Sequence, residues 1–149
     1  MKRSPGSKLF PVVVGLSIGL SVALLVQHIY FSGTSYEQEL KRAAAEINKS
    51  CPLMVDEQTR LDQVEVADSN SIRYSYTLIN KVKSETDVVE MKASLTDVII
   101  EDVETNPQMA INRKHNTTMV YSYKDSKGDF LFDIVVTPEI YNHDTKHKH

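Results

Sequence analysis

The stretch Ile72-Arg-Tyr-Ser-Tyr-Thr-Leu78 alternates bulky apolar residues with polar residues along its whole length. Successive side chains of a β-strand point to opposite faces, so this period of two predicts a strand with one face against a core. A second run, 61–67, alternates in the same way and is separated from the first by the turn-rich segment 68–71. The two runs together predict a hairpin. The apolar face of the first run consists of Ile72, Tyr74, Tyr76 and Leu78.

A second hairpin is predicted near the end of the chain. The run 117–124 alternates, and so does 129–137, which stops at Pro138. Between them, Asp125-Ser-Lys-Gly128 has turn residues, including a glycine that can take a positive φ. The apolar residues of the two runs are Met119, Tyr121, Tyr123, Phe130, Phe132, Ile134 and Val136.

Two segments show the spacing of amphipathic helices. The first begins at the capping box Thr34–Glu37 and ends before Cys51-Pro52, since the residue before proline is biased away from helix. The second follows the polar start Ser84-Glu-Thr-Asp87 and is predicted to stop near Glu104. Their apolar stripes contain Tyr36, Leu40, Ala43, Ala44 and Ile47 in the first, and Val88, Met91, Leu95, Val98, Ile99 and Val103 in the second.

The order of these elements predicts an α+β domain over residues 34–138. A helix-hairpin-helix-hairpin order is most simply folded as a four-stranded antiparallel sheet with helices on one face. The polar segment 139–149 is predicted to be a disordered tail.

An uncharged segment precedes this domain. No Asp, Glu, Lys or Arg occurs from Leu9 to Tyr36, and the charged residues before it are all basic. Residues 9–31 are therefore predicted to form one transmembrane helix, long enough for a bilayer core. By the positive-inside rule, residues 1–8 are cytoplasmic and the domain is periplasmic, so we expect a single-pass protein of the cell inner membrane. The alternative is a signal peptide cleaved after Ala23, which leaves the compartment unchanged.

Small residues recur on one side of the predicted membrane helix. Gly15 and Gly19 form a GxxxG pattern, which Ala23 extends by four residues. Such a face lets two helices approach closely, so a homodimer formed through this helix is one hypothesis. The alternative is that glycine is simply common in membrane helices.

Composition narrows the function classes. All 20 acidic residues but only 14 of the 17 basic residues follow the uncharged segment, so the remainder carries a formal charge of −6. Nucleic-acid binding is not expected, because it requires clustered Lys and Arg. The single cysteine, Cys51, excludes an internal disulfide and is expected either to be buried or to pair between chains. No motif indicates a cofactor or an enzyme, and no metal site is predicted, since the His-rich segment 143–149 reads as a solvated tail.

The segment Asn48-Lys-Ser-Cys-Pro-Leu-Met-Val-Asp-Glu-Gln-Thr-Arg-Leu-Asp62 resembles one found in small bacterial membrane-anchored envelope proteins. Those proteins have an Asn-x-x-Cys-Pro run before Val-Asp-x-x-Thr-Arg-Leu-Asp. The Tyr-x-Tyr strands and the glycine-containing hairpin are also similar to that group. The resemblance implies an envelope location and no particular activity.

The same segment holds the candidate site residues Asp56, Thr59, Arg60 and Asp62. A bidentate pair of Arg60 with Asp56 or Asp62 is expected to pin this loop to the first strand or to contact a partner. The leading hypothesis is a non-enzymatic domain that binds another envelope protein or supports an assembly. The alternatives are a small hydrolase or ligand-binding domain with a pocket at residues 56–62, and an inhibitor or immunity protein whose acidic surface covers a basic active site.

Overall fold

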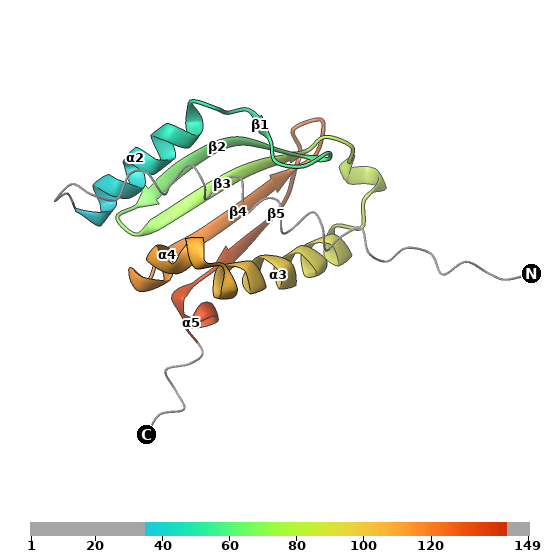
Figure 1. The fold of residues 1–149 in the computed structure, drawn as a ribbon. Coiled ribbons are helices and arrows are strands. Elements are labelled where there is room, and N and C mark those ends of the chain that lie inside the picture. The colour runs from blue at the N-terminus through green and yellow to red at the C-terminus, as the bar shows by residue number, and fades with distance from the viewer. Residues whose placement is uncertain (1–34, 143–149) are drawn as a thin grey trace, which may run out of the picture.

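A five-stranded sheet forms the centre of the domain (Figure 1). The structure, a computed structural model, describes residues 35–142 of the chain. The strands lie in sequence order across the sheet: β1 (Leu53–Met54), β2 (Thr59–Asp68), β3 (Ser71–Leu78), β4 (Thr118–Lys124) and β5 (Phe130–Val136). β5 forms one edge of the sheet, and the short β1 begins the other.

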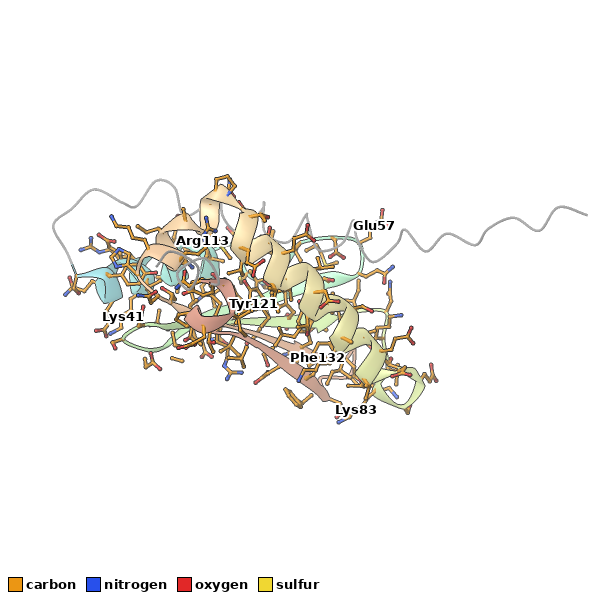
Figure 2. All side chains as sticks on the ribbon, turned by 90° about the horizontal axis from the view of Figure 1, so that it is seen from below. Lys41, Glu57, Lys83, Arg113, Tyr121 and Phe132 are labelled. Atoms are coloured by element: carbon orange, nitrogen blue, oxygen red, sulfur yellow. The ribbon has the colours of Figure 1, made fainter. Side chains whose placement is uncertain are left out.

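The helices lie on one side of the sheet (Figure 2). α2 (Tyr36–Asn48) packs on β2, and α3 (Val88–Thr105) packs along β5. The other helical elements are short: η1 (Lys83–Glu85), η2 (Pro107–Met109), α4 (Ala110–Lys114) and α5 (Pro138–Tyr141). Both long helices follow the predicted stripes, although Ser35 rather than Thr34 caps α2, its side chain accepting a hydrogen bond from the Gln38 amide.

The predicted four-stranded antiparallel sheet is wrong. Both hairpins are confirmed, because β2 pairs antiparallel with β3 and β4 pairs antiparallel with β5. The two hairpins, however, join through a parallel ladder between β3 and β4, and β1 adds a fifth strand beside β2. The connection through α3 is long enough to return the chain to the end of the sheet where β3 began, which a parallel pair requires. β1 has only two residues, too few for an alternating pattern.

The parallel ladder places the strand tyrosines next to one another in the core. Tyr74 stacks on Tyr121 with ring centroids 5.3 Å apart, and Tyr76 stacks on Tyr123 at 5.2 Å. Phe132 of β5 continues the row, 5.1 Å from Tyr123. These aromatic pairs join the two hairpins into one core, which α2 and α3 then cover.

The ordered domain extends past the predicted boundary at residue 138. In α5 the Tyr141 side chain is buried, and its hydroxyl donates a hydrogen bond to the Thr117 carbonyl at 2.8 Å. The first residues of the predicted tail are thus part of the fold. Residues 143–149 lie outside the described residues.

The predicted transmembrane helix falls on a part of the chain that the structure does not describe. Residues 9–31, including Gly15, Gly19 and Ala23, lie outside the described residues. Within residues 35–142, no helix has the length and apolar character needed to cross a bilayer.

Asp125 organises the β4–β5 turn, where Gly128 has the predicted positive φ of 90°. The buried Asp125 carboxylate accepts hydrogen bonds from the amides of Lys83, Lys127 and Asp129 at 2.8, 2.8 and 2.9 Å. The Lys83 amide, followed by those of Asp129 and Lys127, holds the pKa of this carboxyl below its usual value against the opposing effect of burial. One charged side chain therefore ties the turn to η1, just before α3.

We expect Asp125→Asn to lower the thermal unfolding midpoint at pH 7 more than Asp129→Asn, the matched change at an exposed position of the same turn. Because the folded-state pKa is lowered, the contribution of Asp125 is present above the unfolded pKa of about 3.9 and is lost as pH falls through the folded value. The difference in thermal unfolding midpoint between wild type and Asp125→Asn should therefore become smaller below about pH 4, as measured by circular dichroism. An undiminished gap in acid would contradict this role of the charge.

Candidate functional site

Two of the four predicted site residues come together on the sheet face opposite the helices. The Arg60 Nε donates to Asp62 Oδ1 at 2.6 Å, which joins Arg60 to one of the two carboxylates, Asp56 or Asp62, considered for a bidentate pair. Asp62 Oδ2 accepts a hydrogen bond from the Thr77 hydroxyl at 2.6 Å and lies 3.3 Å from the Lys124 Nζ. Burial raises the pKa of Asp62, but the hydrogen bonds from Thr77, Arg60 and Lys124 outweigh it and leave the pKa lowered. This carboxylate is therefore a charged anchor that links β2, β3 and β4.

The other two predicted residues shape the turn between β1 and β2. Asp56 Oδ1 accepts hydrogen bonds from the amides of Gln58 and Thr59 at 2.7 and 2.8 Å. The Thr59 side chain is buried, and its carbonyl accepts a hydrogen bond from the Val55 amide at 3.0 Å. Asp56 is thus engaged in its own turn, while Asp62 takes the pair with Arg60. A role for these four residues in contacting a partner stays a prediction.

Cys51 lies at the edge of the core, partly exposed and packed against buried apolar residues. Burial, and secondarily the Asp62 carboxylate, raise the pKa of this thiol above its usual value. A raised pKa keeps the thiol protonated at neutral pH, which is the opposite of what a cysteine nucleophile needs. Among residues 35–142, no three His, Cys, Asp or Glu side chains are grouped so that they could hold a metal ion.

An apolar groove runs between the first half of α3 and β5, on another part of the molecule. Its volume is about 800 Å³, and Figure 2 shows the labelled Phe132, one of its lining residues, beside α3. The predicted residues 56, 59, 60 and 62 do not line it. Its walls are Val88, Val89, Lys92, Ala93, Thr96 and Asp97 from α3, and Phe130, Leu131, Phe132, Asp133 and Val135 from β5.

Exposed apolar side chains gather at this groove. Four large apolar side chains are exposed in the described part of the chain, and three of them line it: Val89, Phe130 and Val135, which are 81%, 55% and 47% exposed. The fourth, Met54, is 47% exposed and lies on β1 at the opposite end of the sheet. Single exposed apolar residues are normal, but a cluster in a concave surface is typical of a binding site.

Sequence reasoning missed this groove because it placed Phe130 in the core and left Val89 and Val135 unassigned. The signal was present at two positions. Val89 is adjacent to the apolar stripe of its helix but not part of it, and Val135 occupies a polar position of an alternating strand. An apolar residue on the polar face of an amphipathic element is the pattern that marks an exposed contact.

Residues 35–132, most of the described domain, match the model of a family described as a domain of unknown function (DUF8479). The chain belongs to this family. No curated protein matches the chain.

Three solved structures share the fold of this DUF8479 member. A protein described as secreted, from Pseudomonas aeruginosa, is 14% identical with a TM-score of 0.57, and the match covers 73% of this chain and 99% of that one. The pilotin EpsS of the Vibrio vulnificus type 2 secretion system is 10% identical with a TM-score of 0.53, covering 83% and 94%. The type II secretion pilotin AspS of Vibrio cholerae is 12% identical with a TM-score of 0.50, covering 84% and 96%. At such identities the likeness concerns the fold alone.

Proposed function

We propose that this protein is an extracytoplasmic, non-enzymatic domain that binds another protein of the cell envelope and supports its assembly. The observation that carries the proposal is the groove between α3 and β5, in which Val89, Phe130 and Val135 are exposed together. When a partner removes apolar surface of this kind from water, the free energy of the complex falls, which favours binding. That two proteins of the same fold are pilotins of secretion systems supports an assembly role.

The proposed location has its own support. The charged residues before the uncharged segment 9–31 are all basic, which favours export of everything after it. Export is expected whether the segment remains as an anchor or is cleaved after Ala23. The resemblance of residues 48–62 to segments of envelope proteins agrees with that compartment.

Photocrosslinking in cells tests the function. A photoreactive amino acid is placed in the full-length chain at Val135, at Met54 as the control with equal exposure, and at Arg60 on the open sheet face. We expect Val135 to capture one envelope protein that the Met54 position does not capture. Capture from Arg60 alone would move the binding surface to the segment of residues 56–62. If none of the three positions captures a protein, the result argues against the proposed function.

A further inference from the structure

The groove lies beside the free edge of β5, and this edge could accept another strand. Within the described chain, no strand pairs with the far side of the seven-residue β5, which leaves the outward-pointing backbone N–H and C=O groups of alternate residues without a strand partner. Natural proteins usually blunt such an edge with Pro, Lys, a bulge or a covering element. β5 contains no Pro or Lys, and its single charge, Asp133, is paired with Arg73 at 3.2 Å. The β4–β5 register shift lies only at the start of the strand.

The surroundings of this edge are acidic. The charged residues that line the groove are Lys92, Asp97 and Asp133, the last paired with Arg73. In the wider surroundings, α3 and residues 129–136 together contain seven carboxylates and one basic residue, Lys92. Asp97 lines the groove, and the exposed Asp129 stands at the beginning of β5. Complementary charge steers association and penalises wrong partners, so the expected occupant is basic.

The same charges disfavour a second copy of this chain. Two domains joined through their β5 edges would bring the acidic surfaces together, and like charges facing each other across a strand pair are destabilising. An anionic lipid surface is disfavoured for the same reason.

We infer that an extended, basic segment of the partner pairs with the free edge of β5 as a sixth strand. Apolar side chains of that segment contact Val89, Phe130 and Val135, and its Lys or Arg side chains face the carboxylates of α3. Main-chain hydrogen bonds then supply affinity, and the groove supplies specificity, as in other cases of strand addition. This inference rests on the proposed function and names the chemistry of its partner.

The test uses the full chain in a non-ionic detergent and three fluorescent peptides of about ten residues, roughly the length of one strand. The first alternates Val and Lys, the second alternates Val and Glu, and the third has the composition of the first at helical spacing. Only the first peptide is expected to bind, with affinity that falls as salt rises. Binding is also expected to slow hydrogen exchange of β5 amides.

Matched variants locate the site. Val135→Lys adds a positive charge that repels the basic peptide, and a lysine on the edge strand also disfavours pairing with another strand. This variant should weaken binding of the Val/Lys peptide by about tenfold or more. Met54→Lys, the same change at an equally exposed residue of the opposite edge, should leave binding within about twofold of wild type. Asp97→Lys should weaken binding and reduce its salt dependence, whereas Glu57→Lys, in the β1–β2 turn, should not.

Several results would overturn the inference. They are preference for the acidic or the helical peptide, equal loss in Val135→Lys and Met54→Lys, or no binding by any peptide. A large gain in affinity on removal of residues 143–149 would instead assign the groove to the chain's own tail. If Val135 captures an envelope protein in cells while these peptide results fail, the proposed function stands and strand addition does not.

Discussion

Tyr76→Ala is expected to lower the free energy of unfolding by about 3–5 kcal/mol, the usual cost of truncating a large buried aromatic residue. The Tyr76 side chain is 1% exposed and stacks on Tyr123 across the β3–β4 ladder. Truncation removes this aromatic pair and leaves a cavity at the joint between the two hairpins. A domain of this size has a total stability of about 5–15 kcal/mol, so the variant is expected to be only marginally folded.

Urea denaturation followed by circular dichroism measures this loss. Tyr76→Phe is the matched control, since it keeps the ring and its stacking and should cost far less. Val89→Ala is the surface control, because that side chain is largely exposed, and a change within about 0.5 kcal/mol is expected. A Tyr76→Ala variant as stable as Tyr76→Phe would show that the stacked tyrosines do not hold the hairpins together.

The tyrosine row also shows how far the sequence predicts the fold. Alternation over 72–78 and 117–124 identified the apolar face of each strand that enters the core, because burial on one face requires a period of two, although Thr77, Thr117 and Val120 outside that set are buried as well. The same alternation is satisfied whether β3 and β4 run parallel or antiparallel, since Tyr76 reaches the core in both cases. Direction depends on where the α3 connection returns the chain, which is a tertiary property. The parallel ladder could not be deduced from either strand alone.

In the candidate site, too, contacts between residues close in sequence could be predicted, whereas contacts between different strands could not. Proximity in the sequence left both Asp56 and Asp62 as candidate partners of Arg60, and the structure pairs Arg60 with Asp62, which lies two residues further along β2. Thr77 and Lys124, which complete the cluster, come from other strands, so only the register reveals them. The groove at Val89 and Val135 likewise needs the packing of α3 beside β5, two elements separated by η2, α4 and β4.

Asn48→Ala is expected to lower the free energy of unfolding by about 2–4 kcal/mol, because it leaves two backbone groups without their partner. The Asn48 Oδ1 accepts a hydrogen bond from the Val64 amide at 2.8 Å, and its Nδ2 donates to the Val64 carbonyl at 2.8 Å. This reciprocal contact fixes the end of α2 to β2, just after the register shift between Leu61 and Gln63. The first residue of the Asn-x-x-Cys-Pro run thus has a structural role.

Asn48→Asp separates the two hydrogen bonds. A carboxylate still accepts from the Val64 amide but cannot donate to the Val64 carbonyl, so at pH 7 this variant should also be destabilised. Protonation restores a donor, and its stability relative to wild type should therefore recover as pH falls toward about 4. Asn48→Ala has no group to protonate and should show no such recovery. Parallel urea titrations of both variants at the two pH values measure the difference, and identical pH profiles would exclude a hydrogen bond from residue 48 to the Val64 carbonyl.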